Sequence, residues 1–221
     1  MPTLLTNMPV SPAHMPVVHA AQTAGWKVIK SLGGRLETNL GNALAIYGAP
    51  EIVRAIARVN RISLFAPPAN WPKHLPTEFQ APDARGSTAD EGISFDLAPE
   101  QGGFESTVRC FVLDRMVVTL SPVSHQGKSC RVRGKWSAPE EVYDQALSFC
   151  EQLLGDSRVL MPPAFALDIG QMAGGDWCVI GGTAAWCAHI YSCSPAAILN
   201  VLLRSCKSAS VSHEEAQWLD E

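Results

Sequence analysis

The sequence predicts an α+β fold in which a small N-terminal α/β lobe precedes an antiparallel sheet with packed helices. Two observations lead to this prediction. In the first 76 residues, segments with helical periodicity alternate with short apolar segments typical of strands, an order that favours a small and largely parallel sheet. From residue 108 onward, two apolar segments flank Asp114 and Arg115, as in an antiparallel hairpin with a two-residue turn.

Composition limits the classes of function. The chain has 221 residues, of which 47% are hydrophobic and 17% charged, a balance typical of a globular protein. A net charge of -4 gives no general attraction to nucleic acid, and the densest basic stretch, Lys128–Lys135, is interpreted as a solvated hairpin end or loop. The most apolar stretch, Trp177–Tyr191, is too short and too interrupted to cross a membrane. We therefore expect no nucleic-acid partner and no membrane span.

The seven cysteines favour a cytoplasmic location. Their number is odd, and they form neither a Cys-x-x-Cys pair nor a spacing typical of a metal site. The first residues also lack the cationic and apolar regions of a secretory signal. We expect reduced thiols, several of them packed in the core as small hydrophobic groups.

Residues 1–76 are predicted to form the N-terminal lobe and a linker. Residues 1–16 show no period and are expected to be an extended or poorly ordered lead-in. Pro50 is tolerated in the first turn of a helix whose apolar residues recur at helical spacing. The four prolines of residues 66–76 predict a rigid, irregular connection. The other predicted elements are a helix over Val17–Ala24 and strands over Trp26–Ile29, Ala43–Tyr47 and Ile62–Phe65.

The rest of the chain is predicted to hold one loop, one ordered region and a tail. Residues 77–107 show no period and are expected to be a loop or partly disordered segment. Order is expected over residues 108–206, where the hairpin is followed by two helices and by strands over Ala164–Ile169 and Trp177–Ile180. The polar residues 207–221 are expected to form a frayed tail.

Capping patterns place the two C-terminal helices. Ser137 and Glu140 have the spacing of a capping box, which would open a helix that ends at Gly155. Ser194 followed by Pro195 predicts the start of the last helix. Serine caps free N–H groups of the first turn, and proline has no N–H that would be left without a partner there.

Five motifs in order resemble one known family. They are an arginine-led hairpin, a strand that ends in aspartate, a closing strand with its loop and helix, and two linker features upstream. In chain order they are Tyr47–Pro50, Ala66–Pro76, Arg109–Val123, Pro162–Gly170 and Trp177–Cys206. Together they resemble the ATP-grasp superfamily, and within it the uncharacterised clade named after two arginines and one lysine.

The resemblance implies a fold, two cofactors and a reaction. ATP-grasp enzymes hold ATP and Mg²⁺ between two α+β lobes and activate a carboxylate as an acyl-phosphate, which an amine or thiol then attacks. The chain would thus resemble a carboxylate-amine ligase that acts on a small-molecule or peptide carboxylate. By the same resemblance, Arg109 would contact phosphate, and Asp168 with Thr183 would hold the metal. The alternatives are a strand arginine paired with a neighbouring carboxylate and an aspartate that caps the turn before Gly170.

Two departures from the family pattern weaken the ligase hypothesis. Residues 181–183 are Gly-Gly-Thr where the family has Glu-x-Asn, so the second carboxylate is missing. The phosphate-binding lysine has no counterpart between Lys73 and Lys128, in a region that is shorter than in the family. The leading hypothesis is therefore a nucleotide-binding ATP-grasp protein with weakened or lost catalysis. An active ATP-dependent ligase and a non-catalytic protein-interaction domain are the alternatives.

Overall fold

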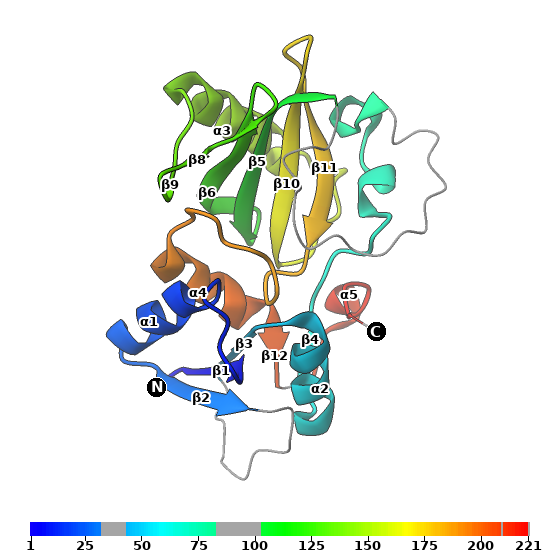
Figure 1. Cartoon of the computed structure of the whole chain (residues 1–221). Coiled ribbons are helices and arrows are strands. Elements are labelled where there is room, and N and C mark those ends of the chain that lie inside the picture. The colour runs from blue at the N-terminus through cyan, green and yellow to red at the C-terminus, as the bar shows by residue number, and fades with distance from the viewer. Residues whose placement is uncertain (32–42, 83–102, 209, 221) are drawn as a thin grey trace.

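The computed structural model describes residues 1–31, 43–82, 103–208 and 210–220. Two groups of elements stand one above the other in Figure 1, with the parallel sheet in the lower group and the antiparallel sheet in the upper. Among the described residues, none of the helices combines the length and apolar character that a membrane crossing requires.

The lower group contains a three-stranded parallel sheet in the order β2-β1-β3, as expected for a small α/β lobe. Its strands are β1 (Thr3–Asn7), β2 (Lys27–Ser31) and β3 (Leu44–Tyr47), and α1 (Met15–Thr23) connects the first two. The predicted lead-in was wrong, because residues 3–7 form the central strand and all five are buried. A central parallel strand is buried on both faces, so its sequence lacks the alternation that marks a strand.

The end of the chain returns to this lobe. Helix α4 (Pro195–Arg204) packs against α1 and β3, and β12 (Cys206–Lys207) pairs with β4 (Ser63–Leu64) outside the parallel sheet. The helix α2 (Pro50–Asn60), which begins at Pro50 as predicted, precedes β4, and α5 (His213–Ala216) follows β12. These returning elements complete the lobe.

The tail is not frayed over its described residues. The Asp220 carboxylate accepts two hydrogen bonds from Arg54 of α2, at 2.7 and 2.9 Å, and Trp218 is buried. The prediction failed because polar composition alone does not show a partner that is 166 residues away.

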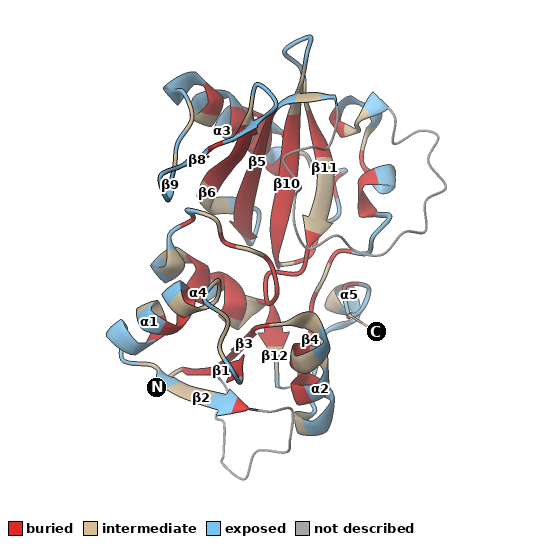
Figure 2. Ribbon diagram, in the orientation of Figure 1, coloured by how far each residue is buried: buried red, intermediate tan, exposed pale blue. Residues whose placement is uncertain are grey.

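The upper group is a five-stranded sheet in the order β11-β10-β5-β6-β7, whose strands run antiparallel. One face packs against α3 (Glu140–Gly155), which supplies Phe149 and Leu153 to the core on that side. The strands are β5 (Phe104–Leu113), β6 (Met116–His125), β7 (Lys128–Ser129), β10 (Ala164–Met172) and β11 (Trp177–Thr183). Figure 2 shows β5 and β10, at the centre, buried along most of their length.

Local patterns in this half were partly confirmed. Asp114 and Arg115 form the hairpin turn with φ of 45° and 68°, as a two-residue turn requires. Ser194 caps α4 by accepting from the Ala197 amide at 3.4 Å. The capping box of Ser137 was wrong, because Pro139 occupies the N-cap position and no side chain caps α3.

The segment 77–107 is more ordered at its ends than expected. A short 3₁₀ helix, Thr77–Phe79, opens the segment just after another at Trp71–His74, and Phe79 is buried in the core on the α3 side of the sheet. Strand β5 already begins at Phe104. The prediction of a loop over residues 83–102 falls outside the described residues.

Candidate functional site

The candidate site lies on the face of the five-stranded sheet that points away from α3. Val108 and Cys110 of β5 belong to the core beneath α3, so Arg109 between them points to the opposite face. Asp168 of β10 lies directly across from Arg109 in the antiparallel register. Residues directly opposite on neighbouring strands share a face. The register therefore brings together two of the three residues that the sequence analysis singled out.

Arg109 and Asp168 form a buried, bidentate ion pair. The arginine Nε donates to Asp168 Oδ1 at 2.7 Å and Nη2 donates to Oδ2 at 2.8 Å. The Arg109 side chain has no exposed surface, and that of Asp168 is 6% exposed. Burial alone would lower the pKa of Arg109, but the Asp168 carboxylate outweighs that effect and raises the pKa above its ordinary value. The Asp168 carboxylate thus favours the charged form of the Arg109 guanidinium.

Thr183 completes the predicted trio at the end of β11. Its Oγ1 lies 3.5 Å from Asp168 Oδ2, at the outer limit for a hydrogen bond. Gly181 lies directly opposite Asp168, and a Cβ atom added there would meet no atom of the other described residues within 4 Å, its chain neighbours aside. A Cβ on Gly182 would come within 2.8 Å of the Pro67 ring. The position where the resemblance expects a glutamate is therefore open, and its neighbour is closed by packing.

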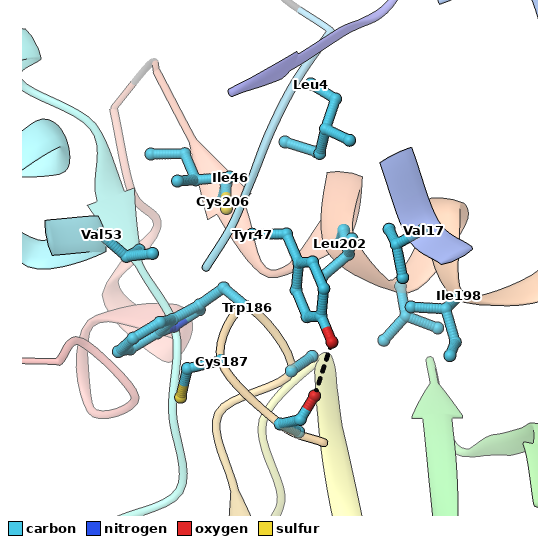
Figure 3. Packing of buried hydrophobic residues seen from close by; sticks show 14 of the residues in the cluster. Leu4, Val17, Ile46, Tyr47, Val53, Trp186, Cys187, Ile198, Leu202 and Cys206 are labelled. Atoms are coloured by element: carbon cyan, nitrogen blue, oxygen red, sulfur yellow. Dashed lines mark hydrogen bonds between the residues drawn. The ribbon is translucent and has the colours of Figure 1, made fainter. Parts of the chain in front are cut away.

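The loop of residues 184–193 covers this face and joins the two groups of elements. The His189 carbonyl accepts from Arg109 Nη1 at 3.2 Å, and the Tyr191 ring lies 5.2 Å from the Arg109 guanidinium. The Tyr47 hydroxyl donates to the Ala188 carbonyl at 2.9 Å, the contact drawn as a dashed line in Figure 3. Trp186, labelled in the same view, is fully buried and donates to the Phe65 carbonyl at 3.0 Å. The ion pair is thus sealed beneath a well-anchored loop.

Comparison with known protein families shows which family has this architecture. The profile of an ATP-grasp domain, family 2 of the clade named after two arginines and one lysine, matches residues 51–201, well over half of the chain. The chain belongs to this ATP-grasp family. The α+β fold that the sequence predicted is thereby confirmed as an ATP-grasp fold. Among curated proteins, no sequence matches the chain.

Solved structures similar to this ATP-grasp chain include three ATP-grasp proteins or ligases. D-cycloserine synthetase DcsG is 10% identical, with 91% of this chain and 98% of that chain covered, at a TM-score of 0.40. The RimK domain ATP-grasp protein from Sphaerobacter thermophilus is 9% identical over 92% and 100% of the two chains, also at 0.40. The ATP-grasp ligase PsnB, complexed with a minimal precursor, is 13% identical over 83% and 90%, at 0.35.

The candidate site of this ATP-grasp chain does not fit Mg²⁺. Among the described residues, no three or more His, Cys, Asp or Glu side chains are grouped so that they could hold a metal ion. Mg²⁺ needs several oxygen ligands in octahedral geometry, whereas both Asp168 oxygens already accept from Arg109. The roles predicted for Asp168 and Thr183 as metal ligands, and for Arg109 as a phosphate ligand, stay predictions. Each would require the ion pair to open.

The cysteines of this ATP-grasp chain do not supply a reactive thiolate. All seven are free and buried. Burial raises the pKa of Cys187 and Cys193 to about 12, and that of Cys130 and Cys178 to about 11. A thiol with a raised pKa is protonated near neutral pH and is a poor nucleophile.

Sequence reasoning missed one feature close to the ion pair. A groove of about 690 Å³ lies beside the covering loop and is lined by residues of segments 12–16, 131–136 and 189–192. Its cations come from the basic stretch that was interpreted as a solvated hairpin end. The signal was the basic stretch itself, with Trp136 directly after it, but the sequence could not show which residues lie across from it.

Proposed function

We propose that this protein is an ATP-grasp member that has lost ligase catalysis and acts by binding, with its affinity for nucleotide weakened by the same change. The observation that carries this proposal is the buried ion pair between Arg109 and Asp168. It occupies the two charged groups on which the ATP and Mg²⁺ chemistry of the family would depend.

Arg109 is the residue that would contact phosphate. Transfer of a phosphoryl group requires cations that reach its oxygens, because negative charge must be neutralised as the group moves. Three donor atoms of Arg109 are already bonded, two to Asp168 and one to the His189 carbonyl. The side chain also has no exposed surface. A phosphate would have to displace both the carboxylate and the covering loop to reach this guanidinium.

The site lacks the second carboxylate that the family pattern supplies for Mg²⁺. A single aspartate and a threonine hydroxyl leave Mg²⁺ with too little negative charge to compete with a guanidinium at 2.7 Å. Gly181 supplies no side chain at the position opposite Asp168. We therefore expect any binding of ATP by this protein to be weak and independent of Mg²⁺.

Thermal unfolding with ATP, in MgCl₂ or in EDTA, tests this proposal without a known substrate. A ligand at about 100 times its dissociation constant adds about 2.7 kcal/mol of stability, which corresponds to roughly 5–11 °C for a chain of this size. We expect the two buffers to give the same small shift, and no ADP to form above the blank. A large shift that needs Mg²⁺ and disappears in Asp168→Asn would contradict the weakened nucleotide binding, and ADP formed above the blank would contradict the loss of catalysis.

A gain-of-function variant sharpens the test. The double substitution Gly181→Glu with Thr183→Asn restores the family pattern, and the Cβ atom of the new side chain at position 181 meets no described atom within 4 Å beyond its chain neighbours. We expect it to bind Mg²⁺–ATP more tightly than the wild type, because the added carboxylate faces Asp168. The matched control carries Gly181→Gln with Thr183→Asn, which has the same shape without the charge. Equal behaviour of the two variants would show that the lost acid is not the reason for weak binding.

A further inference from the structure

The groove beside the covering loop has walls from three separate parts of the chain. One wall is the loop between β1 and α1, another is the hairpin of β8 (Arg131–Val132) and β9 (Lys135–Trp136), and the third is the segment 189–192. Its volume of about 690 Å³ lies in the range of small-molecule sites.

The charged groups that line the groove are all basic. Arg131 and Lys135 are exposed, and no described carboxylate lies within 4 Å of either. His189 lines the same space, and no acidic residue belongs to the lining. Other cations of the protein, such as Arg158 and Arg204, are engaged with carboxylates. The groove therefore offers positive charge that an anionic ligand could use.

Aromatic rings line part of the groove. Trp136 meets Tyr191 edge to face at 5.0 Å between ring centroids, and Tyr191 lies 4.5 Å from the His189 ring. Tyr191 also lies over the buried Arg109, with 5.2 Å between the guanidinium carbon and the ring centroid. Tyr191 adopts φ of 47°, a left-handed conformation that residues other than glycine rarely keep without compensating contacts. The buried Arg109 thus contacts the aromatic wall of the groove through Tyr191.

The position of the groove agrees with a general rule of parallel sheets. Ligands bind beyond the carboxyl ends of the strands, where chain connections leave in opposite directions. Strand β1 lies between β2 and β3, and the loop that leaves its carboxyl end forms one wall. That loop is held by a hydrogen bond from Asn7 Nδ2 to the Pro9 carbonyl and by one from the Ala13 amide to Ser11 Oγ. The wall is therefore preformed.

We propose that this groove binds a small organic anion, namely an aromatic ring that carries a carboxylate or a phosphate group. The anionic oxygens would contact Arg131 and Lys135, and the ring would pack against Trp136 and Tyr191. The inference rests on the proposed function, since a binding protein needs a binding site, but it uses residues other than the ion pair. It also requires neither ATP nor Mg²⁺.

Calorimetric titration of the full chain in EDTA tests the proposal with three probes. Phenylacetate and phenyl phosphate carry the two kinds of anion, and benzyl alcohol is their neutral counterpart. We expect at least one anionic probe to bind at least about tenfold more tightly than the alcohol, because only the anions can use Arg131 and Lys135. The stronger of the two anions identifies the headgroup. Binding of neither anion, or equal binding of all three probes, would overturn the proposal.

Two charge variants of the same hairpin region locate the site. Arg131→Gln with Lys135→Gln removes the groove cations, whereas Lys128→Gln with Arg133→Gln removes two exposed cations that do not line the groove. We expect the first variant to lose at least about tenfold in affinity and the second to stay within about twofold. An equal loss in both would mean that the probes sense only general charge, and the site would be refuted. Magnesium-dependent binding of ATP would contradict the proposed function but leave this result unaffected.

Discussion

Replacing Asp168 by asparagine removes the negative charge from the buried ion pair and keeps the shape of the side chain. Arg109 would then remain charged, with no exposed surface and no counter-ion at 2.7 Å. At that distance and an effective dielectric constant of about 20, the gross attraction is about 6 kcal/mol, which desolvation of the two groups largely offsets. Loss of one partner of a buried pair nevertheless costs about 3–5 kcal/mol, because the other charge stays buried.

The expected effect is large compared with the total stability of a domain. A loss of about 3–5 kcal/mol corresponds to a fall of roughly 6–20 °C in the unfolding temperature of a chain of this size. Urea unfolding at neutral pH would measure the free energy of unfolding directly, with the slope expected to stay unchanged. The double variant Arg109→Met with Asp168→Leu serves as the control. We expect the free energy of unfolding of this double variant to lie closer to the wild-type value than that of Asp168→Asn, because the double variant leaves no uncompensated charge.

The size of the Asp168→Asn effect decides whether the pair acts as described. If Asp168→Asn lowers the free energy of unfolding by less than about 1 kcal/mol, the two groups do not interact strongly in a desolvated site, and the proposal that the ion pair replaces a catalytic centre is refuted. A gain in stability in Asp168→Asn would also contradict the proposal, because functional sites often hold groups that destabilise the fold.

Three further predictions concern other parts of the chain. Hydrogen bonds from Lys207 and Arg204 lower the pKa of Glu215 to about 2 from its ordinary 4.5. Its contribution to stability is therefore present above about pH 5 and lost as the pH falls towards 2. In Glu215→Gln, the free energy of unfolding should depend less on pH over that window. Gly182→Ala should lower the free energy of unfolding by about 1–3 kcal/mol, because its Cβ would contact the Pro67 ring, whereas Gly181→Ala should stay within about 0.5 kcal/mol. The seven buried thiols should react with a disulfide reagent within minutes only after denaturation; rapid reaction in the native protein would contradict their burial.

Local sequence patterns predicted those elements whose determinants are close together in the chain. The turn at Asp114 and Arg115, the proline that opens α2 and the serine that caps α4 each depend on a few neighbouring residues. Strand β1 and the C-terminal tail depend on distant partners instead. Residues 3–7 become a central strand only because β2 and β3 flank them, and the tail is held by Arg54.

The candidate site shows the same division between local and distant causes. Sequence motifs identified Arg109, Asp168 and Thr183, and the missing acid at Gly181 could be seen directly. What the motifs could not show was that Arg109 and Asp168, 59 residues apart, are bonded to one another. That depends on the register between β5 and β10, which a one-residue shift would undo by turning one side chain to the other face. Arg109 and Asp168 can form a ligand site with Thr183 or a structural ion pair with each other, and pairing across the sheet, rather than residue type, determines which arrangement the protein adopts.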